Sequence, residues 1–114
     1  MALIVQKYGG TSVANPERIK NVARRIARFK EQGHQLIVVL SAMSGETNKL
    51  IALAKEMQPT PDPRELDAVV STGEQVTIGL LAMGLKAIGV DAKSYTGGQV
   101  KVLTDDTLDR KSVV

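Results

Sequence analysis

The chain has 114 residues, of which 43% are hydrophobic and 24% are charged, a composition typical of one modest globular domain rather than of a disordered or fibrous protein. It contains no cysteine, which excludes disulfides and thiolate metal sites. A net charge of +3 is compatible with nucleic-acid binding, but aromatic residues make up only 3% of the chain, so the usual stacking platforms for bases are scarce.

The first expected strand spans residues 2–8, and its apolar run indicates burial on both faces. That run is too short for a signal sequence or a membrane span, so we expect a cytoplasmic protein with no membrane partner. Asn15 then caps a helix that has Pro16 at its first position and ends at Gly33. The basic residues of this helix alternate with apolar ones at helical spacing. We interpret them as a solvent-exposed face and expect no nucleic-acid partner.

Residues 36–42 form a second strand with the continuous apolar character of a central parallel strand. Thr47 or Asn48 caps the next helix, which runs to about Met57, and the segment PTPDP at 59–63 then breaks the chain.

A helical pattern resumes at Arg64. A bend is expected near Thr72 and Gly73, so that a separate, strongly apolar helix runs from Glu74 to about Ile88 and forms a buried layer.

The remaining pieces are a short strand at 91–95, a turn at 96–99 and an extended segment at 100–104. The alternation of strands and helices predicts an α/β domain with a mainly parallel sheet and helices on both of its faces.

Three polar segments that contain glycine follow a strand or precede an expected helix: KYGGTS, SAMSGETN and STGE. Ligands of open parallel sheets bind at the carboxyl ends of the strands. In KYGGTS, Gly9 and Gly10 let the backbone approach an anion, and Lys7 adds a full positive charge. The cluster suits a phosphate group, although a tight turn between a strand and a helix explains the same spacing equally well.

The other two segments also have two readings. Ser41, Ser44 and Thr47 can line a site, but hydroxyl groups in a flexible connection that caps a helix are the commoner case. Glu74 stands at an expected helix start, where its carboxylate either faces the site or offsets the helix dipole. The residues alone favour the dipole role.

Taken together, KYGGTSV, SAMSGETN, STGEQ and YTGGQ resemble the N-terminal half of the catalytic domain of the aspartate kinases, which are amino acid kinases. The resemblance runs from residue 1 to about Asp106. It implies a three-layer α/β/α sandwich of the carbamate kinase type. It also implies that ATP, with Mg²⁺, donates its γ-phosphate to the side-chain carboxylate of L-aspartate. The product is 4-phospho-L-aspartate, in the first step toward lysine, threonine and methionine.

The resemblance also implies roles for individual residues. Lys7 is the implied catalytic residue, which stabilises the transferring phosphoryl group, Thr47 is the implied direct contact of aspartate, and Glu74 holds the substrate ammonium group. The implied ATP-binding residues are Lys7, Tyr8, Gly9, Gly10 and Ser41. The implied aspartate-binding residues are Gly45, Glu46, Thr47, Asn48, Lys49 and Glu74.

Aspartate kinases continue through the rest of the catalytic domain and through ACT regulatory domains, so residues 1–114 correspond to the N-terminal part of an amino acid kinase domain. We therefore expect a truncated chain that is inactive alone, from a homo-oligomeric parent whose partners are ATP and L-aspartate. Two alternatives stay open. One is a noncatalytic fragment that self-associates through an exposed sheet edge. The other is a kinase of the same fold with a different acceptor.

Overall fold

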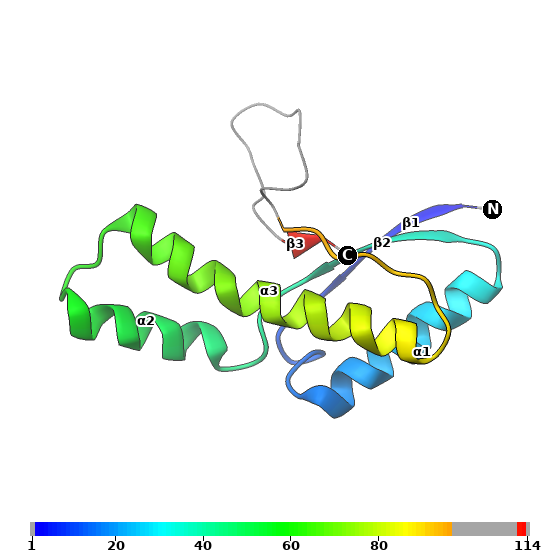
Figure 1. Ribbon diagram of the computed structural model, residues 1–114, viewed down its shortest axis with the longest axis horizontal. Coiled ribbons are helices and arrows are strands. Elements are labelled where there is room, and N and C mark those ends of the chain that lie inside the picture. Colours follow the sequence, from blue (N-terminus) through cyan, green and yellow to red (C-terminus); the bar gives the residue numbers. More distant parts are fainter. Residues whose placement is uncertain (1, 97–111, 114) are drawn as a thin grey trace.

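The structure is a computed structural model that describes residues 2–96 and 112–113 (Figure 1). The elements in chain order are β1 (Leu3–Tyr8), α1 (Pro16–Glu31), β2 (Gln35–Leu40), α2 (Glu46–Met57), α3 (Pro63–Ala87) and β3 (Ser112–Val113). β1 and β2 pair in parallel, and β3 pairs antiparallel with the other edge of β2. The expected α/β class with a parallel strand pair is therefore confirmed.

The first helix begins as the sequence predicts. The side-chain oxygen of Asn15 accepts a hydrogen bond from the amide of Arg18 at 2.9 Å, and Pro16 occupies the first helical position. The helix ends at Glu31, two residues before Gly33, whose φ of 85° only glycine adopts readily. Both ends of α1 are thus set by local sequence signals.

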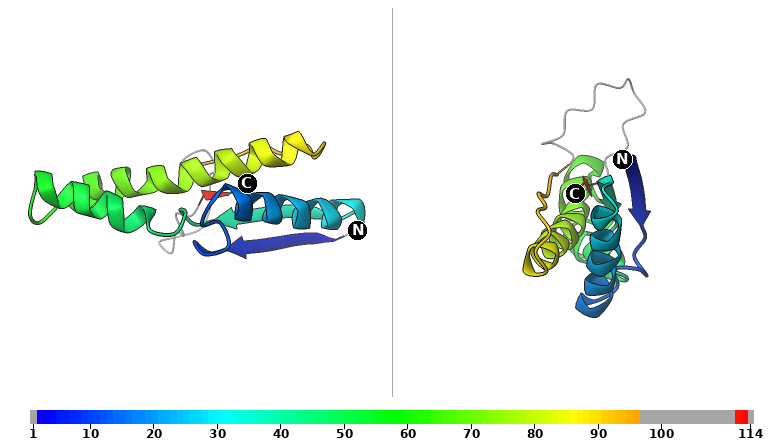
Figure 2. Two further views of the ribbon diagram at one scale, coloured as in Figure 1. Left: turned by 90° about the horizontal axis from the view of Figure 1, so that it is seen from below. Right: turned by 90° about the vertical axis from the view of Figure 1, so that its right-hand side faces the viewer.

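The core lies between the strands and the pair α1 and α3, which pack against each other. In Figure 2 both helices lie on one side of the strands. α1 presents an apolar stripe to this core, and its exposed basic residues lie on the other face, as expected. The buried apolar residues of this core are Tyr8, Val13, Ile19, Val22, Ala23, Ile26, Val38, Leu40, Ile78, Leu81 and Leu85.

The expectation that the first strand is buried on both faces is wrong for the described residues. Burial alternates along β1: Tyr8 is buried, whereas the side chains of Leu3 and Val5 are 62% and 65% exposed. The reason is that the helices of the described residues cover one face of the sheet. Ile37, the register partner of Val5, lies on the uncovered face with it.

The predicted bend near Thr72 and Gly73 is also wrong, because α3 is one continuous helix of 25 residues. The hydroxyl groups of Ser71 and Thr72 each donate to the backbone carbonyl three residues earlier, at 3.0 and 2.7 Å, so they are satisfied without breaking the helix. The helix start lies at Asp62, whose carboxylate accepts from the amide of Glu65 at 3.1 Å. Polar residues at 71–73 therefore belong to a helix interior.

Two smaller expectations also fail. Neither Thr47 nor Asn48 caps α2, because the helix already begins at Glu46 and its N-cap is Gly45, which makes no side-chain capping bond. Residues 91–94 form no strand, and Tyr95 forms an isolated bridge. The predicted turn after Thr96 and the extended segment at 100–104 lie outside the described residues.

α2 and the first half of α3 lie side by side and extend beyond the carboxyl ends of β1 and β2 (Figures 1 and 2). Among the described residues, α3 is the one helix whose length and apolar composition match a membrane span. Its buried side packs against α1 and α2. Helices in the core of a globular protein can meet the same criteria of length and apolar composition.

Candidate functional site

The three glycine-bearing segments meet around one residue, Ala42, which follows β2. A Cβ atom placed on Gly10 would lie 3.2 Å from the carbonyl oxygen of Ala42 and 3.6 Å from Cα of Ser44. A Cβ atom placed on Gly73 would lie 3.0 Å from Cβ of Ala42. The loop after β1, the loop after β2 and the middle of α3 therefore converge at the carboxyl ends of the strands.

The loop after β1 is a tight turn in which some backbone amides donate no hydrogen bond. The amide of Ser12 donates to the carbonyl of Gly9 at 3.1 Å, and the amide of Val13 donates to Gly10 at 3.3 Å. Val13 is fully buried and anchors the turn. In the part of the chain that the structure describes, the amides of Gly9, Gly10 and Thr11 donate no hydrogen bond. The segment thus forms the tight turn that the sequence allows, and this turn also leaves amide donors for an anion.

The loop after β2 brings a helix N-terminus to the same place. Gly45 has φ 85°, which turns the chain into α2, and the helix has no side-chain cap. The uncapped first turn keeps unsatisfied amides and a partial positive charge. Its residues Thr47, Asn48 and Lys49 are exposed, whereas Glu46 is half-buried, with its Cβ atom 3.9 Å from the Cβ position at Gly73.

Glu74 lies next to this junction in the interior of α3, not at a helix start. The helix begins eleven residues earlier at Pro63, so Glu74 cannot offset the N-terminal dipole of α3. The favoured reading from the sequence therefore fails on geometry. Glu74 is half-buried and directly follows Gly73, the residue whose Cβ position meets Ala42.

Three other predicted residues sit at the carboxyl ends of the strands. Lys7 is exposed, and the alternation along β1 places it on the face opposite Tyr8, beside its register partner Val39. The amide of Ser41 donates to the carbonyl of Tyr8 at 3.2 Å and so ties the two strand ends together.

Tyr8 itself is part of the core. Its hydroxyl donates to Oε1 of Gln6 at 2.9 Å. Burial raises the pKa of the Tyr8 phenol, and the positive charge of Arg25 partly opposes this rise. Its predicted contact with ATP stays a prediction, as do the ligand roles of the other site residues.

The donor set of the site fits phosphate better than a bare cation. Within residues 2–96 and 112–113, no group of three or more His, Cys, Asp or Glu side chains could hold a metal ion. The site offers backbone amides, hydroxyl groups and a lysine instead. The central position of Ala42 has no local signal in the sequence, because its contacts join residues far apart in the chain.

Comparisons with known proteins show the family of the chain. Residues 2–112 match the amino acid kinase family. The chain is 59% identical to the aspartate kinase of Pseudomonas putida over 114 residues, which are all of this chain and 28% of that protein. It is 62% identical to the aspartokinase of Pseudomonas aeruginosa and 55% identical to that of Thermus thermophilus, in each case over 92% of this chain and 26% of the relative.

The crystal structure of aspartate kinase from Synechocystis is similar to 86% of this chain, with a TM-score of 0.83 and 52% identity, and the match covers 17% of that chain. The chain thus spans about a quarter of the length of the curated relatives given above. Since the family match covers almost every residue and the fold agrees, the chain belongs to the amino acid kinase family, and its relatives within that family are aspartate kinases.

Proposed function

We propose that this chain forms the N-terminal part of the catalytic domain of an aspartate kinase. In that reaction the γ-phosphate of ATP is transferred to the side-chain carboxylate of L-aspartate, as the first step toward lysine, threonine and methionine. The observation that carries the proposal is the contact of Ala42 with the positions of both Gly10 and Gly73. It brings the candidate phosphate turn and the candidate aspartate-binding residues together in one place.

The nucleotide side of the site consists of Lys7, Tyr8, Gly9, Gly10 and Ser41. The unsatisfied amides of the β1–α1 turn suit the phosphate oxygens, and the N-terminus of α2 adds positive potential. The Lys7 ammonium stabilises negative charge on the phosphoryl group in the transition state of its transfer. Mg²⁺ keeps most of its waters and binds largely through substrate phosphates, so it would neutralise charge on the nucleotide without a carboxylate cage from this chain.

The aspartate side consists of the segment 45–49 and Glu74. Thr47 contacts the amino acid, and the Glu74 carboxylate pairs with its ammonium group, which leaves the distal carboxylate directed at the phosphate. One oxygen of that carboxylate forms a bond to the γ-phosphorus, while the bond from this phosphorus to the bridging oxygen of ADP breaks. The attacking carboxylate is already ionised at neutral pH, so the step needs no general base.

Further properties follow from the same proposal. The rest of a longer protein would supply the adenine pocket, additional charged groups and the ACT regulatory domains. The enzyme would be cytoplasmic and homo-oligomeric, and the 114-residue chain alone would be inactive. An amino acid kinase with a different acceptor is the enzymatic alternative, and the acceptor dependence of the reaction distinguishes the two.

A chimera tests the proposal directly. Residues 2–112 replace the matching segment of the Pseudomonas putida aspartate kinase, to which the chain is 59% identical. ADP release in the presence of ATP, Mg²⁺ and each acceptor measures phosphoryl transfer, and hydroxylamine traps an acyl phosphate product as a hydroxamate. We expect product with L-aspartate and none with N-acetylglutamate or a nucleoside monophosphate.

The matched variants are Glu74→Gln and, as a control, Glu56→Gln at the exposed end of α2. Glu74→Gln should raise the KM for aspartate roughly 10²-fold, the scale of breaking a desolvated charge pair. The KM for ATP should change far less, and Glu56→Gln should behave like the parent chimera. A soluble, folded chimera without aspartate-dependent product would contradict the proposal.

A further inference from the structure

A polar cavity lies between the end of β1 and α1, and it shares Tyr8 with the candidate nucleotide side of the site. Its volume is about 190 Å³, and it is lined by Tyr8, Ser12, Arg18, Asn21, Val22 and Arg25. Four of these residues follow each other at positions i, i+3, i+4 and i+7 of α1, so they form one stripe along the helix. None of the lining residues comes from the β2–α2 loop or from α3.

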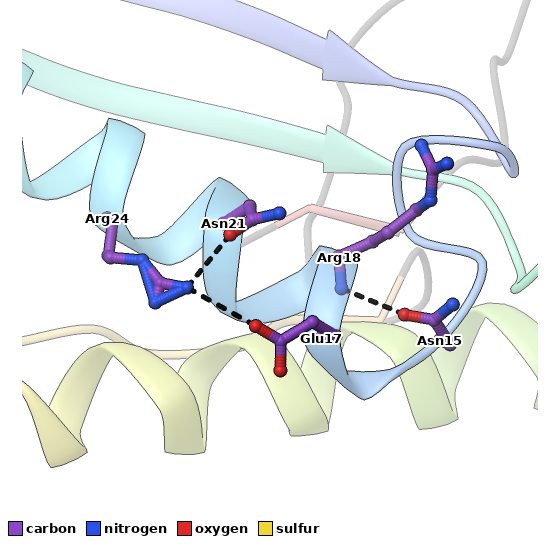
Figure 3. A network of polar contacts seen from close by, with 5 residues as sticks. All are labelled: Asn15, Glu17, Arg18, Asn21 and Arg24. Atoms are coloured by element: carbon purple, nitrogen blue, oxygen red, sulfur yellow. Dashed lines mark hydrogen bonds and ion pairs between the residues drawn. The ribbon is translucent and has the colours of Figure 1, made fainter.

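The two arginines of this cavity have no acidic partner in residues 2–96 or 112–113. Their neighbour Arg24 behaves differently: its guanidinium lies 3.7 Å from the Glu17 carboxylate and donates to Oδ1 of Asn21 at 2.8 Å (Figure 3). Figure 3 also shows the Arg18 side chain extending away from Glu17 toward the β1–α1 loop. The cavity thus keeps two positive charges for a ligand.

Two of the four neutral residues that line the cavity supply further donors. The carbonyl oxygen of the Asn21 side chain is already used by Arg24, so its NH₂ group remains as a donor, and the Ser12 hydroxyl is a further donor. Arg25 and the buried Tyr8 line the same cavity. A lining of donors and two guanidinium groups without a carboxylate matches a doubly charged oxyanion.

The size of the cavity narrows the ligand further. Pockets for larger organic ligands usually enclose about 300–1,000 Å³. A cavity of about 190 Å³ is smaller than these pockets and has room for one phosphoryl group. We propose that Ser12, Arg18, Asn21 and Arg25 form a second anion site, which binds inorganic phosphate or a small phosphate monoester. This inference does not depend on the aspartate kinase reaction.

The site has a direct link to the β1–α1 turn. The amide of Ser12 donates to the carbonyl of Gly9 at 3.1 Å, so a phosphate that binds the Ser12 side chain also steadies the residue that closes this turn. Occupancy of the cavity would therefore be felt at Gly9 and Gly10, although neither residue lines it.

The test is a titration of the ¹⁵N-labelled 114-residue chain with inorganic phosphate, at constant ionic strength set by chloride. We expect saturable shifts of the Ser12 and Asn21 amides, followed by smaller shifts at Gly9 and Gly10. Arg18→Gln and Arg25→Gln should each raise the Kd for phosphate roughly tenfold, the scale of one charge-assisted hydrogen bond. The matched control Arg28→Gln, at an exposed arginine of the same helix that does not line the cavity, should stay within about twofold.

Each remaining outcome counts for or against the site. Circular dichroism shows whether each variant is folded, and Arg18→Lys, which keeps the charge, should recover part of the affinity. Equal weakening by Arg28→Gln, or no saturable shifts, would overturn the proposal. A parallel titration with ATP separates the two sources of phosphate. The Kd for ATP, obtained from the shifts of the Ser12 and Asn21 amides, is then compared with the Kd for phosphate. If ATP has the lower Kd and Lys7→Ala abolishes this preference, the cavity belongs to the nucleotide site and the proposal is wrong.

Discussion

At the scale of single residues, the junction of the candidate site depends on the absence of side chains. Gly73 lies in the interior of α3, where glycine destabilises a helix by about 0.5–1 kcal/mol relative to alanine. A Cβ atom added at Gly73 would lie only 3.0 Å from Cβ of Ala42. This close approach explains why the cost of a glycine in the helix is tolerated. A larger residue would push the loop after β2 away from α3.

Gly73→Ala should therefore destabilise the chain, although alanine favours the helix. The new methyl group would also lie 3.4 Å from Cδ1 of Leu50, and overpacking of this kind costs about 1–3 kcal/mol. Gly79→Ala in the same helix is the control, because no atom lies within 4 Å of its Cβ position. We expect urea denaturation to show a loss for Gly73→Ala and a gain of about 0.5–1 kcal/mol for Gly79→Ala.

At the scale of elements, the sequence predicted those boundaries that local signals determine. The Asn15 cap, the Pro16 start and the turn at Gly33 all appear where they were expected. The predictions that failed rest on residues that are typical of loops but that also occur inside helices. The Ser71, Thr72 and Gly73 cluster resembles a loop in sequence, but the hydroxyls bond within the helix and the glycine serves a contact with a distant loop. Such long-range contacts have no local signature.

The caps of α1 and α2 offer a test of this distinction. Asn15→Ala removes the hydrogen bond to the Arg18 amide and should lower the free energy of unfolding by about 0.5–2 kcal/mol. Asn48→Ala should cost nothing or stabilise slightly, because Asn48 lies inside α2, where alanine has the higher helix propensity. Urea denaturation monitored by circular dichroism measures both. Equal losses would mean that Asn48 has a capping role after all.

At the scale of the whole molecule, the described residues form one layer of helices on one face of a small sheet. The opposite face exposes the apolar side chains of Leu3, Val5 and Ile37. β1 is also the edge of this sheet, so its outer backbone groups are open to pairing. The resemblance predicts a second helical layer, and the described residues place no helix on this face.

An uncovered apolar face beside an open strand edge should make the 114-residue chain self-associate, because pairing two copies buries the face and satisfies the edge together. Sedimentation across a dilution series should show a mass that rises with concentration. Val5→Lys places a charge at the centre of this face, where its register partner Ile37 is also apolar, and should shift the chain toward monomer.

The control for this prediction is Met57→Lys, which adds the same charge at a methionine that is 88% exposed at the far end of α2. Both variants raise the net charge equally, so general repulsion affects them alike. If the uncovered sheet face drives association, Met57→Lys should associate like the unmodified chain while Val5→Lys does not. A strictly monomeric unmodified chain, or equal dissociation by the two lysines, would show that the exposed face is not the contact between copies.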